Sequence, residues 1–105
     1  MAWCVAFNPI KLRVILVSVD IPDATNYFYA EAVAKYWAKK IGGKVACMLP
    51  SYGEPKYAVF SGRRLVALGD NPNRLVTMFG TYAIIVPVET LRLHSIDDVM
   101  AYLRP

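Results

Sequence analysis

The sequence contains no glutamine, one histidine and two cysteines. Proteins from very hot environments are depleted in labile amide side chains, so the missing glutamine indicates a thermophilic source. A lone histidine offers no readable serine–histidine–aspartate arrangement. Cys4 and Cys47 lie too far apart for a zinc or redox-pair spacing. They are either two buried free thiols or, in a protein from a hot environment, a disulfide that persists inside the cell.

Long hydrophobic runs are also lacking. The longest is far short of the about 20 residues that a membrane-spanning helix needs. The apolar start of the chain, residues 1–7, is too short for a signal peptide and has no basic residues before it. We therefore expect a soluble cytoplasmic protein without a membrane partner. A length of 105 residues predicts a single domain, residues 1–105, with one sizeable core.

Apolar residues and positive charge are present in excess. The apolar fraction of 56% exceeds the usual value of roughly 45–50%, which favours burial of some of this surface in an oligomer interface. The net charge of +4 is moderately basic and permits binding to nucleic acid or another polyanion.

The longest strongly patterned segment, residues 23–43, is predicted to be a helix. Asp23 or Thr25 is suited to cap its start, and Gly42 and Gly43 are suited to end it. Its helical periodicity puts an apolar stripe on one face, consisting of Tyr27, Ala30, Val33, Ala34, Trp37 and Ile41.

The opposite face of this helix carries Phe28 and Tyr36, which are unusual on a solvated surface. Three readings remain open. A loop or chain end covers them, a symmetric partner helix packs on them, or they form a base-stacking surface beside the lysines of the same helix.

The remaining elements follow from periodicity and turn residues. We expect strands at 12–19, 44–49, 57–60, 65–68 and 82–86, an optional short strand at 1–7, and helices at about 72–79 and 96–103. Ser61–Arg64 predicts a hairpin tip that presents two arginines, with Gly62 suited to the positive φ of a tight turn. Asn71 with Pro72 and Ser95 with Asp98 predict the helix starts. The order β-α-β-β-β-α-β-α predicts an α+β two-layer sandwich on a mixed β-sheet.

Five residues resemble the PD…ExK pattern of the restriction-endonuclease-like nucleases. They are Pro22-Asp23 and Glu54-Pro55-Lys56. The resemblance implies that two carboxylates hold a metal and that a lysine steadies the attacking water. It departs from the family because Asp23 stands at a helix start rather than on a strand and Pro55 interrupts the second strand. Ordinary turn and capping residues account for the same positions.

The basic residues are more informative when taken together. Aromatic residues that suit base stacking lie among them in the sequence, namely Phe28, Tyr36, Tyr52 and Tyr57. The candidate nucleic-acid-binding residues are Lys35, Lys39, Lys40, Lys44, Arg63, Arg64 and Arg74. The alternative interpretation is that these lysines and arginines are ordinary solvated surface residues that bind no ligand.

We therefore expect a non-catalytic protein that binds DNA or RNA, or a subunit of a nucleic-acid-processing complex, without cofactor or metal. The alternative is a structural or regulatory protein that self-associates, most simply as a homodimer, or docks a protein partner through Phe28 and Tyr36. A metal-dependent nuclease is the third reading.

Overall fold

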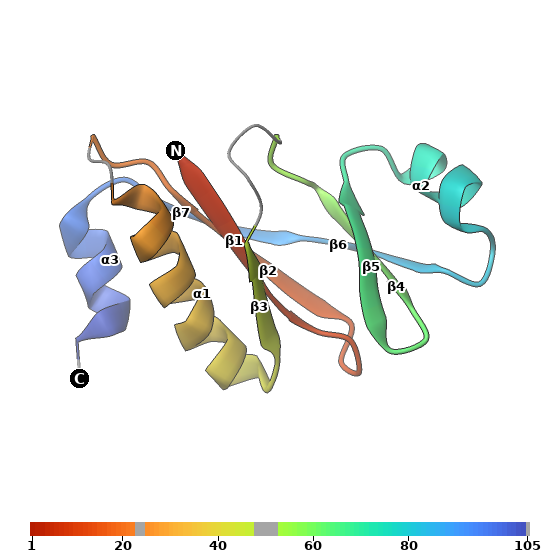
Figure 1. The fold of residues 1–105 in the computed structure, drawn as a ribbon, viewed down its shortest axis with the longest axis horizontal. Helices are drawn as coiled ribbons and strands as arrows, with labels where there is room; N and C mark the ends of the chain where they lie inside the picture. The colour runs from red at the N-terminus through yellow and green to blue at the C-terminus, as the bar shows by residue number, and fades with distance from the viewer. Residues whose placement is uncertain (23–24, 48–52, 105) are drawn as a thin grey trace.

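The computed structural model of the chain describes residues 1–22, 25–47 and 53–104 (Figure 1). These residues form three helices and two β-sheets, which confirms the α+β class. Along the chain the elements are β1 (Ala2–Asn8), β2 (Arg13–Val19), α1 (Asn26–Ile41), β3 (Lys44–Cys47), β4 (Tyr57–Ser61), β5 (Arg64–Gly69), α2 (Pro72–Phe79), β6 (Ile84–Pro87), β7 (Glu89–Leu93) and α3 (Ile96–Leu103).

The first sheet has the strand order β3-β1-β2-β7. Its β1 strand runs antiparallel to both β2 and β3, while β7 runs parallel to β2. Helices α1 and α3 cover one face of this sheet (Figure 1), where buried Val17, Val33 and Val99 belong to one core cluster. The strands β1 and β2 are buried on both faces, as their nearly continuous apolar sequences require.

The second sheet has the strand order β5-β4-β6 and is antiparallel throughout. Buried Ala58 and Phe60 of β4 join Trp3, Val5 and Leu16 of the first sheet in a second core cluster. The two sheets therefore share apolar packing on the face of the first sheet that the helices do not cover. Helix α2 lies at the far end of the second sheet (Figure 1).

The chain crosses directly from the second sheet to the first between β6 and β7. Val88 separates the two strands, and its N–H donates to the carbonyl of Lys56 at 2.9 Å. The sequence-based prediction did not include β7 and placed all the strands in one mixed sheet, whereas the structure has two sheets. The expected order of the other elements agrees with the structure.

The predicted helix starts at Asn71 and Ser95 are confirmed. The side chain of Asn71 accepts from the backbone N–H of Arg74, and that of Ser95 accepts from Asp98. Thr25 is the first flanking residue of α1, but its side chain makes no capping hydrogen bond to the helix. Asp23, the other predicted cap, lies outside the described residues.

The predicted core stripe of α1 is correct except at its N-terminal end. Ala30, Val33, Ala34 and Ile41 are buried, and Trp37 packs against the cluster, but Tyr27 is exposed. Helix α1 begins only at Asn26, so Tyr27 lies in its first turn, away from the sheet; Ala38 is buried as well.

Cys4 and Cys47 form a disulfide between β1 and β3. They stand directly opposite each other in the antiparallel register, with Cα atoms 4.2 Å apart. The disulfide ties the short edge strand β3 to the centre of the first sheet. None of the described helices is long and apolar enough to cross a membrane.

Candidate functional site

Three turns that are far apart in sequence meet at one end of the molecule. They are the β1–β2 turn, the α1–β3 turn and the β4–β5 hairpin tip, all at the lower edge in Figure 1. A cleft of ≈ 490 Å³ lies between them. We call it the basic cleft, and it is lined by Phe7, Asn8, Pro9, Ile10, Gly42, Gly43, Lys44, Arg63, Arg64 and Leu65.

The buried side chain of Asn8 joins two of these turns. Its Oδ1 accepts from the backbone N–H groups of Ile10 and Lys11 at 2.9 and 3.1 Å. Its Nδ2 donates to the carbonyls of Ile41 and Gly42 at 2.8 and 3.1 Å. One amide thus shapes the β1–β2 turn and satisfies carbonyl groups that the end of α1 leaves without helical partners.

Two glycines make the α1–β3 turn possible. Gly42 adopts a left-handed conformation (φ +71°), which ends the helix. Gly43 packs against the backbone of Phe7 so closely that a Cβ atom there would collide with the Phe7 carbonyl. This close approach brings Lys44 into the lining of the cleft.

The hairpin tip places two arginines opposite Lys44. Gly62 and Arg63 both have positive φ, +57° and +62°, as the type I′ turn of a two-residue hairpin requires. The positive φ of Gly62 was expected from the sequence. That of Arg63 is unusual, because a side chain in the left-handed region costs about 1–2 kcal/mol. The predicted exposure of both arginines is confirmed.

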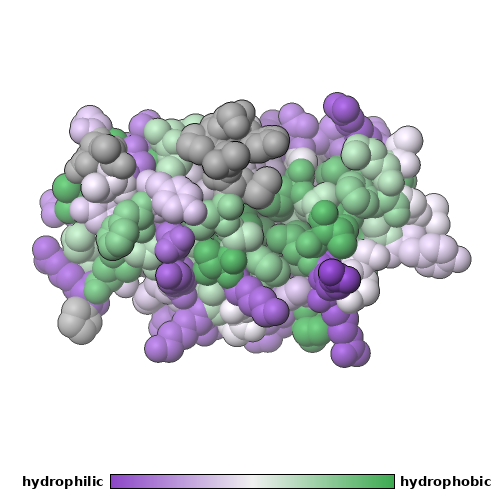
Figure 2. All heavy atoms as spheres, in the orientation of Figure 1, coloured by the Kyte–Doolittle hydropathy of each residue, from purple (hydrophilic) through white to green (hydrophobic). Residues whose placement is uncertain are grey.

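The charges of the three turns themselves are all positive. Residues 7–13, 36–47 and 60–65, which form the three turns and their flanks, contain no acidic residue, and their basic residues are Lys11, Arg13, Lys39, Lys40, Lys44, Arg63 and Arg64. Among the described residues, Lys44, Arg63 and Arg64 make no ion pair, whereas Arg13 pairs with Glu89 and Arg92 with Glu54. Figure 2 shows hydrophilic side chains along this lower edge.

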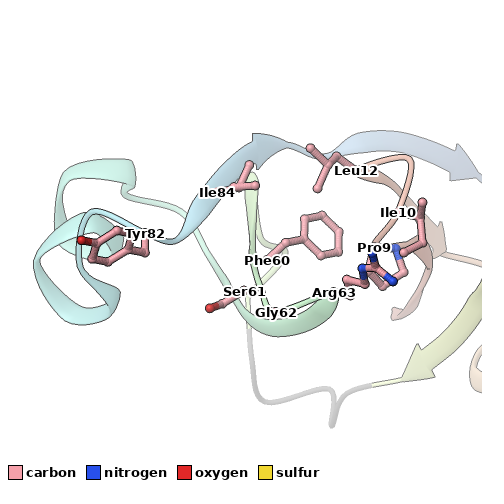
Figure 3. A pocket seen from close by; sticks show the side chains of 9 residues that line it. All are labelled: Pro9, Ile10, Leu12, Phe60, Ser61, Gly62, Arg63, Tyr82 and Ile84. Carbon is pink, nitrogen blue, oxygen red and sulfur yellow. The ribbon is translucent and has the colours of Figure 1, made fainter.

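An apolar groove adjoins the basic cleft and shares Pro9, Ile10 and Arg63 with it. Its volume is ≈ 360 Å³. In Figure 3 the ring of Phe60 lies at its centre, with Ile10 and Leu12 on one side and Ile84 on the other. Tyr82 lies at the outer end beyond Ile84, where its side chain projects outward and is 95% exposed.

The structure brings only some of the predicted basic residues together. Lys44, Arg63 and Arg64 line the cleft, and Lys39 and Lys40 lie nearby in the last turn of α1. Lys40 stands over the ring of Tyr36, 5.5 Å from its centroid. Lys35 pairs with Glu31 on the solvent side of α1, and Arg74 lies on α2, outside the cleft lining.

The two predicted interface aromatics have different surroundings. Tyr36 packs edge-on against Trp37 and against Tyr102 of α3, with ring centroids 5.5 Å apart in both pairs. Phe28 touches the neighbouring Tyr29 ring but remains 68% exposed. Part of the aromatic face is thus covered within the chain by α3. Tyr57 begins β4, at the end of that strand away from the tip, and Tyr52 lies outside the described residues.

The carboxylate of Glu54 is held by two partners. Its Oε1 accepts hydrogen bonds from Ser18 Oγ at 2.6 Å and from Arg92 Nη1 at 3.0 Å, and its Oε2 forms an ion pair with Arg92 Nη2 at 2.7 Å. Burial raises the pKa of Glu54, but the hydrogen bonds from Ser18 and Arg92 and the charge of Arg92 outweigh it and leave the pKa below the ordinary value. Both carboxylate oxygens are therefore engaged. Asp23, its partner in the nuclease-like pattern, lies outside the described residues.

Sequence reasoning missed three residues: Lys11 and Ile10 in the β1–β2 turn, and Tyr82 at the outer end of the apolar groove, before β6. Tyr82 was expected to start a strand, but β6 begins only at Ile84. No signal in the sequence joins these positions, because their proximity arises from the packing of the two sheets. No known protein family, curated protein or solved structure matches this chain, so its function has to be argued from the geometry of this end of the molecule.

Proposed function

We propose that this protein binds nucleic acid through the basic cleft, without catalysing a reaction on it. The observation that carries the proposal is the convergence of Lys44, Arg63 and Arg64 around one cleft with no acidic residue in its lining. Phosphate groups supply the complementary charge, and arginine side chains bind them with two parallel hydrogen bonds.

The hairpin tip supports a role for Arg63 beyond structure. A glycine would relieve the left-handed backbone at position 63, yet the chain has an arginine there. Unfavourable backbone conformations are concentrated at functional sites, where the side chain is needed for a task other than folding.

The test is a titration of fluorescently labelled DNA and RNA oligonucleotides, followed by anisotropy at several salt concentrations. Affinity should fall as salt rises, because bound phosphates release counterions. Replacing Arg63 and Arg64 by alanine should weaken binding and reduce the salt slope by about 1.4 units on a single strand, about 0.7 for each lost phosphate contact.

The matched control replaces Lys56 and Arg74, which are also exposed but lie outside the cleft, and therefore removes the same charge. It should retain most of the affinity. Absence of binding to single- and double-stranded DNA and RNA at low salt would refute the proposal.

Self-association through α1 is the second candidate function. Phe28 supports it, because a phenylalanine that is 68% exposed on a helix is suited to an interface. In a two-fold dimer each copy contributes the same residue. Truncating a buried interface aromatic commonly costs about 2 kcal/mol, a roughly thirtyfold weaker dimer. Phe28→Ala, with Tyr36 left in place because it packs on Tyr102 within the chain, should then shift a dimer toward monomer. Light scattering that finds the unmodified protein monomeric at high micromolar concentration contradicts this candidate.

We do not favour the hypothesis that the protein is a metal-dependent nuclease. The oxygens of Glu54 already accept hydrogen bonds from Ser18 and Arg92 and form an ion pair with Arg92, which is the arrangement of a structural ion pair. Magnesium- or manganese-dependent cleavage of DNA or RNA that is lost in Glu54→Ala or Asp23→Ala would overturn this view.

A further inference from the structure

We infer that the apolar groove beside the basic cleft receives the bases of a single strand, with Tyr82 as the stacking residue, so that the protein prefers single-stranded to duplex nucleic acid. The inference rests on the proposed function and adds the class of nucleic acid to it.

The basic cleft and the apolar groove adjoin each other. Pro9, Ile10 and Arg63 line both of them, so these residues form the border where the basic cleft ends and the apolar groove begins. A polymer whose phosphates lie against Lys44 and Arg64 on one side of the border therefore has its neighbouring groups over the groove on the other side.

The groove exposes apolar side chains around an aromatic floor. Phe60 closes its floor and is only 1% exposed, while Ile10 and Ile84 on its sides are 67% and 47% exposed. Leaving such apolar side chains in water is unfavourable, and a flat aromatic ligand would cover them. Phosphate and sugar groups offer no apolar surface of this kind, whereas every base has two apolar faces.

Tyr82 is the most exposed aromatic residue at the groove. Its side chain is almost fully exposed at the outer end of the groove, so both faces of the ring are free to contact a base. In a duplex the faces of the bases are already stacked on each other. Only a single strand presents them to an aromatic side chain. Exposed basic side chains for the phosphates and an exposed tyrosine ring for a base therefore fit a single strand.

The test compares a single-stranded thymidine oligonucleotide of about 12 nucleotides, within the range of roughly 4–16 that single-strand-binding domains cover, with a duplex and with an abasic strand of the same length. The native protein should bind the thymidine strand most tightly. Tyr82→Ala should weaken that binding about five- to tenfold, the lower part of the range for one stacked base. Tyr82→Phe retains the ring and should bind like the native protein.

The abasic strand isolates the contact between ring and base. Tyr82→Ala should bind it as well as the native protein does, because neither complex contains the stacked pair, which is the logic of a double-mutant cycle. The exposed Tyr27 provides the matched control, and Tyr27→Ala should bind the thymidine strand normally.

The outcomes separate the two proposals. Binding of the single strand and the duplex with equal affinity, unchanged by Tyr82→Ala, overturns this inference and leaves the proposed function standing. Competition by poly-glutamate as effective as that by the thymidine strand at equal charge also overturns it. Absence of binding to any nucleic acid refutes the proposed function itself.

Discussion

The side-chain amide of Asn8 donates to the carbonyl oxygen of Ile41 at 2.8 Å, across 33 residues of sequence. The same side chain accepts from the N–H groups of Ile10 and Lys11. A single buried residue therefore sets the position of the β1–β2 turn relative to the end of α1, and with it one wall of the basic cleft.

Asn8→Ala should destabilise the protein by about 1–3 kcal/mol, because it leaves buried backbone groups without partners. Asn8→Asp should cost more at neutral pH, since it places a carboxylate oxygen against the carbonyls of Ile41 and Gly42. Urea denaturation monitored by circular dichroism measures both values. Asn73→Ala, at an exposed site on α2, is the control, and an unchanged unfolding midpoint in Asn8→Ala contradicts the prediction.

Arg63 and Arg64 should respond to glycine in opposite ways. At position 63 glycine relieves the left-handed backbone, a gain that the flexibility of glycine in the unfolded chain partly offsets, so Arg63→Gly should stabilise by up to about 1 kcal/mol. Arg64 begins β5 and pairs with Ser61, so Arg64→Gly should destabilise by about 0.5–1 kcal/mol.

Both variants lose one positive charge from the cleft, and both should bind nucleic acid more weakly. Thermal unfolding and anisotropy titrations of the pair thus separate stability from binding. If Arg63→Gly unfolds at a lower temperature than the native protein, the backbone argument for this arginine is wrong.

Local signals predicted much of the fold. Asn71 before Pro72, Ser95 before Asp98 and Gly62 in the hairpin tip each act within a few residues, so their effects can be read from the sequence. Strand β7 was missed although Leu91 and Leu93 alternate with polar Thr90 and Arg92, because the last predicted strand, 82–86, stopped before Pro87. A proline is tolerated there because β6 lies at the edge of its sheet.

The candidate site depended on information that the sequence does not display. Lys44, Arg63 and Arg64 were named from their basic character, but Arg74 was named on the same grounds and lies outside the cleft. Only the pairing of β1 with β3 and the packing of Phe60 against the first sheet bring the three turns together. The same packing of the two sheets puts Tyr82 at the outer end of the apolar groove and makes it a candidate stacking residue.

Glu54 should make stability depend on pH in the acidic range. Its pKa in the folded protein is lowered, so its contribution is complete above the ordinary value of 4.5 and is lost as the pH falls through the lower folded value. Glu54→Gln should therefore reduce the unfolding temperature at pH 7, and the difference from the native protein should shrink below pH about 4.5. A difference that stays constant down to acidic pH contradicts this assignment.

The disulfide should account for a large part of the total stability. It closes a loop between residues 43 positions apart, and the loss of chain entropy in the unfolded state corresponds to about 4 kcal/mol, compared with about 5–15 kcal/mol for a typical domain. Reductant should therefore lower the midpoint of denaturant unfolding of the native protein. The variant Cys4→Ala with Cys47→Ala should be insensitive to reductant, which separates loss of the crosslink from other effects of the reagent.

Because β3 is an edge strand held to β1 at this point, reduction should also loosen the strand that begins with Lys44 and weaken binding at the basic cleft. A native protein that unfolds at the same midpoint with and without reductant would show that the two cysteines are not linked.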